Sequence, residues 1–161
     1  MCVHVCLLKH FIFYYHTKLH VIAPTVLQSG IFGGGGGEAF DDLNDNFVGI
    51  VGMNIRSNVF VNNTQVFYQG ASLGTADPLS TFTLADGKKL IRMDGMIGGE
   101  LIGQLTFTSN FNCYNVCSMY GPYGSTGEIP FSVEGSEILA IFGGSFMFLD
   151  AIGVYYINSG G

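Results

Sequence analysis

The sequence predicts an all-β domain built from many short strands joined by tight turns. Among its 161 residues are 24 glycines, 14 phenylalanines and 8 tyrosines, and only 11% of the residues are charged. Glycine favours turns, whereas aromatic and β-branched residues favour strands. No stretch has the apolar spacing of a long amphipathic helix. A chain of this length is expected to form one domain with its own core.

Strand-like runs follow one another from residue 48 to the C-terminus. The dipeptides between them include Asp86-Gly87, Gly98-Gly99, Gly121-Pro122 and Gly135-Ser136, all of which are typical of turns. Strands at this spacing indicate an all-β barrel, sandwich or prism. The runs are 48–57, 59–68, 81–85, 88–93, 101–108, 129–133, 137–142 and 149–157.

The first thirty residues differ from the rest because they contain all four histidines. As a signal peptide the segment lacks a basic n-region, and lysines and histidines interrupt its apolar run. No apolar run approaches the ~20 residues of a transmembrane helix. We therefore divide the chain into an N-terminal leader, 1–30, which is either a poor signal peptide or an extra segment, and a domain, 31–161.

The cysteines leave the cellular compartment open. Cys113 and Cys117 could form a disulfide in a turn, but a regular strand would place them ~13 Å apart. An extracellular location is favoured if the leader or the sequon at Asn62 is used, and a cytoplasmic one otherwise.

Charge and ligand spacing exclude several classes of partner. With six Lys and Arg residues and a net charge of -6, the chain is not expected to bind nucleic acid. Cys2, Cys6, His16 and His20 have the paired spacing of zinc ligands, but the gap between the pairs is shorter than a zinc finger requires. We predict no metal and no cofactor.

One carboxylate near the C-terminus stands out as a candidate binding group. Asp150 lies between the small residues Gly143-Gly144-Ser145 and an apolar run, so we expect it at the start of a strand beside free backbone amides. Sugar hydroxyls both donate and accept hydrogen bonds, and an ionised carboxylate with neighbouring N–H groups can satisfy them. The alternative is an aspartate that caps a turn.

A run of five glycines, Gly33 to Gly37, is the second candidate. Glycine permits positive φ and lets a ligand approach the backbone amides. A phosphate-binding loop is not expected, because no Gly-Lys-Ser/Thr follows and the next residues are acidic. A flexible linker is the other interpretation.

We do not expect an enzyme. All histidines lie in the leader, so the strand-rich region lacks a nucleophile with an adjacent base. The carboxylates Asp41, Asp42 and Asp45 could suggest glycoside hydrolysis or a calcium site, but they lack the calcium-loop signature. A solvated turn explains them better.

Two five-residue segments share one pattern. Asn58 to Asn62 and Phe146 to Asp150 each have a turn position, two apolar residues, an aliphatic residue and an Asx. This pattern indicates a repeated supersecondary unit.

Six short motifs stand in order between Ile31 and Ile157. They are Gly36-Gly37-Glu38-Ala39-Phe40-Asp41-Asp42, Ile55-Arg56-Ser57, Gln65-Val66-Phe67-Tyr68, Leu105-Thr106-Phe107-Thr108-Ser109-Asn110, Tyr120-Gly121-Pro122-Tyr123-Gly124 and Leu149-Asp150-Ala151-Ile152-Gly153-Val154-Tyr155. In order and spacing they resemble the jacalin-related lectins. The leader lies outside this resemblance.

The resemblance implies the β-prism I fold, with three four-stranded Greek-key sheets around a pseudo-threefold axis, and metal-independent sugar binding. The sugar would lie between the glycine loop and the loop before the last strand. Its binding residues would be Gly36, Gly37, Met147, Phe148 and Asp150. Mannose or glucose is favoured over galactose, because the galactose type uses a free N-terminal glycine and Gly37 is internal.

The sequence also departs from the family pattern. Phe146 stands where the family has glycine, so its side chain could crowd the sugar or resist the backbone torsion. Asn58 and Asn62 replace the glycine and aspartate of a second site, which we expect to be degenerate. A β-prism with a structural or protein-interaction role is therefore the alternative function. For a lectin, a single shallow site would be weak, so we expect glycan or glycoprotein partners and a homo-oligomer.

Overall fold

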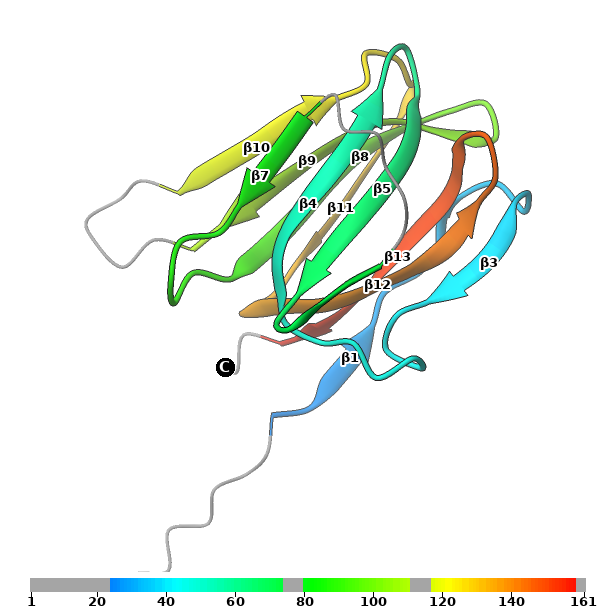
Figure 1. The fold of residues 1–161 in the computed structure, drawn as a ribbon. Helices are drawn as coiled ribbons and strands as arrows, with labels where there is room; N and C mark the ends of the chain where they lie inside the picture. The colour runs from blue at the N-terminus through cyan, green and yellow to red at the C-terminus, as the bar shows by residue number, and fades with distance from the viewer. Residues whose placement is uncertain (1–23, 74–79, 111–116, 159–161) are drawn as a thin grey trace, which may run out of the picture.

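The computed structural model describes residues 24–73, 80–110 and 117–158. These residues form thirteen strands in three sheets and contain no helix (Figure 1). None of them forms a helix that could cross a membrane. The leader residues Cys2, Cys6, His16 and His20, and also Cys113, lie outside the described residues.

The first sheet, which we call sheet A, joins the two ends of the chain. Its central hairpin is C-terminal and its outer strands are N-terminal, in the order β1-β13-β12-β3 with β2 also paired to β13. Because β1 and β2 pair with successive stretches of one edge of β13, they occupy a single strand position. The strands are β1 (Val26–Gln28), β2 (Phe32–Gly33), β3 (Glu38–Asp41), β12 (Glu137–Ser145) and β13 (Leu149–Ile157).

The other two sheets are Greek keys. In sheet C the order is β10-β9-β8-β11, so the fourth strand returns to lie beside the first. Sheet B repeats this arrangement in the order β6-β5-β4-β7. Sheet B contains β4 (Ile50–Ser57), β5 (Val61–Tyr68), β6 (Ala71–Leu73) and β7 (Ser80–Thr83), and sheet C contains β8 (Leu90–Gly98), β9 (Leu101–Ser109), β10 (Ser118–Tyr123) and β11 (Ile129–Glu134).

The core lies on the inner faces of the three central hairpins. Met53 of β4, Leu105 of β9 and Ile152 of β13 are all fully buried, one from each sheet. Successive strand residues point to opposite faces, so each hairpin sends alternate side chains inward. Burial of these apolar side chains is what holds the three sheets together.

Stacked aromatic rings close two of the seams between sheets. Phe32 of sheet A stacks on Phe131 of sheet C with ring centroids 4.4 Å apart. Phe82 of sheet B stacks on Tyr120 of sheet C at 4.3 Å. Such offset aromatic contacts add to the stabilisation that burial provides.

Most predicted strands are confirmed, and the last one, Leu149–Ile157, has the predicted bounds. The prediction of a turn at Gly121-Pro122 is wrong, because these residues form a bulge within β10. β1 belongs to the segment that we assigned to the leader, but it pairs with β13 at the edge of sheet A.

Candidate functional site

Two loops meet at one end of sheet A, at the right of Figure 1. One loop joins β12 to β13, and the other, which contains the glycine run, joins β2 to β3. The pairing of Ser145 with Glu38 at the end of β12 and the start of β3 brings the two loops together. This contact links parts of the chain that are more than a hundred residues apart in sequence.

Asp150 lies directly against the glycine loop. A Cβ atom on Gly36 would lie 2.5 Å from Oδ1 of Asp150, and one on Gly37 would lie 2.7 Å from Oδ2. Both distances are too short for a real side chain. The absence of side chains at Gly36 and Gly37 is therefore what admits the carboxylate. Asp150 is the second residue of β13, as the sequence predicted.

The glycine loop is also anchored at its first half. The Gly34 amide lies within hydrogen-bonding distance of two carbonyl oxygens, 3.0 Å from that of Asp150 and 3.1 Å from that of Glu100. Gly33 and Gly37 have φ values of 109° and 79°, which favour glycine. The glycine run is thus a fixed loop here and not a linker.

Glycines of β12 also make room for the glycine loop. We expected Gly143, Gly144 and Ser145 in a loop, but they form the end of β12. A Cβ on Gly144 would lie 2.5 Å from the carbonyl oxygen of Gly36. Sequence reasoning missed this contribution of Gly144, although its place in a Gly-Gly pair before Asp150 is a usable signal.

The β12–β13 loop presents backbone donors. The Phe146 amide donates to the carbonyl of Phe148 at 3.1 Å and so closes the loop. The amides of Met147 and Phe148 donate to no backbone carbonyl in the part of the chain that the structure describes, and neither do those of Gly36 and Gly37. These groups are available to hydrogen-bond a ligand.

The Phe148 ring holds this loop in place. It packs edge-on against Phe60 of the β4–β5 loop, with ring centroids 6.0 Å apart. Phe60 and Phe148 occupy matching positions of the two segments that share a sequence pattern. The Asn58 amide donates to the Phe60 carbonyl at 3.0 Å, as Phe146 does to Phe148, so the predicted repeat is also a structural one.

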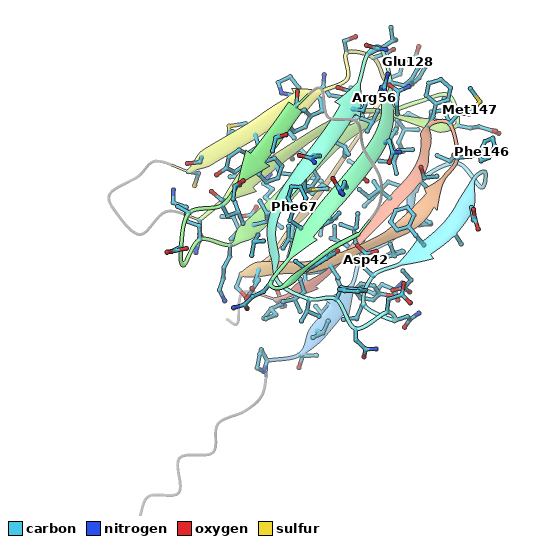
Figure 2. The ribbon with its side chains drawn as sticks, in the orientation of Figure 1. Asp42, Arg56, Phe67, Glu128, Phe146 and Met147 are labelled. Carbon is cyan, nitrogen blue, oxygen red and sulfur yellow. The ribbon has the colours of Figure 1, made fainter. Side chains whose placement is uncertain are left out.

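Phe146 does not have a positive φ. Among the described non-glycine residues only Asn46 has a positive φ, so Phe146 adopts this turn without a left-handed conformation. As whole residues, Phe146 is 79% exposed and Met147 is 70% exposed. Figure 2 shows both side chains projecting outward from the tip of the β12–β13 loop. The Phe146 ring is therefore not packed into the space between the two loops.

The acidic residues after the glycine loop have structural partners. Asp41 belongs to β3, and it accepts hydrogen bonds from the Tyr155 hydroxyl at 2.9 Å and from Asn44. Asp42 is buried and accepts a hydrogen bond from the Tyr68 hydroxyl. The segment that we expected to be entirely a turn therefore begins as a strand.

Burial also controls the ionisation of the Asp42–Tyr68 pair. It raises the pKa of Asp42 above the ordinary 3.8, the hydrogen bond from Tyr68 opposes this shift, and the charge of Asp45 adds to it. The pKa of Tyr68 is raised too, first by burial and then by its bond to Asp42.

Within the described ranges, no group of three or more His, Cys, Asp or Glu side chains could hold a metal ion.

In the hairpin of sheet B, Asn62 takes the place that Asp150 has in sheet A. Its Oδ1 atom is buried and has no hydrogen-bond partner. An amide carries no charge, so it binds a sugar hydroxyl less strongly than a carboxylate does. The expected degeneracy of this second site stays a prediction.

Residues 29–155 of this chain match the family model of the Jacalin-like lectin domain. The chain belongs to the jacalin-like lectin family. Lectins bind carbohydrate and are not enzymes, which agrees with a site that contains one carboxylate and free amides. No curated protein sequence matches the chain significantly.

Solved structures of other family members share the fold. Wild-type Malaysian banana lectin is 23% identical, with a TM-score of 0.70 over 84% of this chain and 100% of the lectin. A mannose-specific jacalin-related lectin from Morus nigra, solved with mannose, is 27% identical, with a TM-score of 0.66 over 88% and 99%. A mannose-binding jacalin-related lectin from Ananas comosus is 26% identical, with a TM-score of 0.68 over 83% and 98%. The predicted β-prism I fold is confirmed.

Proposed function

We propose that this jacalin-like lectin domain binds mannose- or glucose-type glycans without a metal ion and without catalysis. Its binding residues are Gly36, Gly37, Met147, Phe148 and Asp150. The observation that carries the proposal is the contact of the Asp150 carboxylate with the glycine loop, within 2.5 and 2.7 Å of the Cβ positions of Gly36 and Gly37. Because the carboxylate is held in this way, its two oxygen atoms point in fixed directions, and each can accept a hydrogen bond.

In this proposal the Asp150 oxygens accept hydrogen bonds from two sugar hydroxyls. The Gly37, Met147 and Phe148 amides donate to other oxygens of the same ring. Bonds to a charged group contribute about 1.5–3 kcal/mol each, which is enough to orient a single hexose in a shallow site. Oligomers or clustered glycans would raise the overall affinity.

Two observations support mannose or glucose over galactose. Gly37 is internal, so it has no free amino group to offer to a galactose hydroxyl. The Morus nigra and Ananas comosus lectins, at 27% and 26% identity, are described as mannose-specific and mannose-binding.

The test is isothermal titration calorimetry with methyl mannoside, glucoside and galactoside, after a glycan array has been screened. We expect binding of the first two ligands and its loss in Asp150→Ala. Asp86→Ala, which removes an exposed turn carboxylate, is the matched control and should bind as wild type does. A folded wild-type chain that binds no glycan would favour the alternative, a β-prism with a structural or protein-interaction role.

A further inference from the structure

Exposed apolar side chains gather at the end of the prism that carries the proposed sugar site. Phe146 and Met147, at the tip of the β12–β13 loop, are the two most exposed large hydrophobic residues in the described ranges. Figure 2 shows both side chains pointing away from the body of the domain. An exposed apolar side chain adds little to stability, because folding does not remove it from water. The fold therefore does not explain two such residues at one tip.

The β4–β5 loop adds a third apolar side chain to this end. Val59 is 54% exposed, and in that hairpin it has the position that Met147 has in sheet A. The ring contact between Phe60 and Phe148 holds the two loops side by side. The Ser125 amide donates to the Val59 carbonyl at 2.9 Å and so fixes the loop from sheet C. We call the three exposed side chains the apolar tip: Val59, Phe146 and Met147.

The apolar tip and the proposed sugar site share one loop. The Met147 amide is among the groups available to a sugar, whereas the Met147 side chain points away from the domain. Asp150 follows only three residues later. A ligand at this end would therefore meet hydrogen-bonding groups and an apolar surface next to each other. A glycolipid in a membrane offers the same pair, because its sugar headgroup lies next to the acyl chains.

The shape of the apolar tip favours a membrane over a folded protein as the partner. Its side chains project from loop ends, so a rigid partner would need a hollow of matching shape (Figure 2). A bilayer needs no such hollow, because lipids rearrange around an inserted side chain. Phenylalanine and other large apolar side chains bury at the boundary between headgroups and acyl chains.

The charges around the glycine loop favour a neutral membrane. Glu38, directly after the glycine run, and Glu100, whose carbonyl accepts from the Gly34 amide, are both exposed. Arg56 and Glu128, labelled in Figure 2 at the same end, have opposite charges and add no net charge. The net charge of the chain, -6, also opposes an anionic surface. The surface that fits is zwitterionic and carries an uncharged glycolipid.

The two contacts would act together. A single myristoyl chain gives only marginal membrane binding, so three side chains alone do not hold a domain on a bilayer. A single sugar in a shallow site is also a weak ligand. Once the headgroup is bound, however, the apolar tip lies against the lipid at high effective concentration, and the two weak contacts reinforce each other.

We propose that the apolar tip inserts into the headgroup region of a neutral membrane while Asp150 and the loop amides bind the sugar of a mannose- or glucose-type glycolipid. The inference rests on the proposed function. It names a membrane glycolipid as the ligand of the site. It also assigns to the Phe146 side chain a role that binding of a soluble sugar would not reveal.

The first test compares methyl α-mannoside in solution with a dialkyl α-mannoside in phosphatidylcholine vesicles. The wild type should bind the mannoside vesicles at least about tenfold more tightly than the soluble sugar, and should bind pure phosphatidylcholine vesicles only marginally. Phe146→Ser removes a large apolar side chain from the lipid, so it should weaken vesicle binding at least about tenfold, with unchanged affinity for methyl α-mannoside.

Met119→Ser is the matched control. Met119 is 68% exposed, but it lies on β10 and pairs with Thr108, at the end of β9 that is away from the glycine loop. Met119→Ser should therefore bind mannoside vesicles as the wild type does. The same mannoside on a hydrophilic polymer controls for clustering of the sugar, and Phe146→Ser should bind that polymer as the wild type does.

The second test reports insertion directly. The chain contains no tryptophan, so Phe146→Trp places a single fluorescent reporter at the apolar tip. On mannoside vesicles its emission should shift to the blue and be quenched by brominated phosphatidylcholine. Met119→Trp should show neither change.

The outcomes separate the two proposals. If Phe146→Ser and wild type bind mannoside vesicles equally, or if vesicle-bound Phe146→Trp is not quenched, the membrane contact is wrong and the proposed sugar site stands. Equal binding to vesicles with and without the mannoside would also overturn the inference. A wild-type dimer that Phe146→Ser dissociates, measured by sedimentation, would assign the apolar tip to self-association instead. If the wild type binds neither the soluble nor the lipid mannoside, both proposals fail.

Discussion

We expect Gly36→Ala to weaken binding at the proposed site with little effect on the stability of the fold. The added Cβ would lie 2.5 Å from Oδ1 of Asp150, where ordinary contact begins at 3.4 Å, so the carboxylate has to retreat by about 0.9 Å. That displacement lengthens a 2.8 Å hydrogen bond to about 3.7 Å, beyond its useful range. Losing one such charge-assisted bond costs about 1.5–3 kcal/mol, which weakens binding about 10- to 150-fold.

Gly35→Ala is the matched control, because its Cβ meets no atom within 4 Å. Neither Gly35 nor Gly36 has a positive φ, so neither substitution strains the backbone. Calorimetry with methyl α-mannoside should show the loss in Gly36→Ala only, with melting temperatures close to that of the wild type. Equal binding by Gly36→Ala and wild type would refute the proposed role of the carboxylate.

Three further predictions concern the supports of the site. Because burial raises the pKa of Asp42, the contribution of this residue to stability is complete below pH 3.8 and declines as the pH rises through its raised folded pKa. In urea unfolding, the free energy of unfolding of Asp42→Asn should therefore rise relative to that of the wild type over that pH range. A difference between the two that does not change with pH would contradict this. Phe60→Ala removes an aromatic contact with Phe148 that contributes about 0.5–1.5 kcal/mol. This substitution should lower the melting temperature and weaken mannoside binding severalfold. Unchanged binding would show that the β12–β13 loop does not need this contact. Dialysis against EDTA should leave glycan binding unchanged, and a loss restored by calcium would contradict a metal-independent site.

Much of the fold could be predicted from local sequence. Strand β13 combines β-branched and aromatic residues after a turn, so its bounds follow from residues 149–157 alone. β3 was harder, because its acidic residues resemble a turn and its pairing with β12 depends on distant contacts. Gly121-Pro122 resembles a turn but lies in a bulge, because β10 pairs with β9 both before and after these two residues.

The site could be predicted only in part. Asp150 and the glycine run were each recognisable from residue chemistry, but their contact spans more than a hundred residues, and only the family resemblance joined them. The effect of Phe146 depends on where its ring points, which composition does not determine.

The central claim is that Asp150 and the adjacent loop amides hold a hexose. The most direct measurement is a crystal structure of the wild-type chain with methyl α-mannoside. We predict one sugar ring between the two loops, with two hydroxyls within about 3 Å of the Asp150 carboxylate and with the Met147 and Phe148 amides donating to ring substituents. A mannoside bound elsewhere on the prism, with the Asp150 carboxylate facing only solvent, would contradict the account.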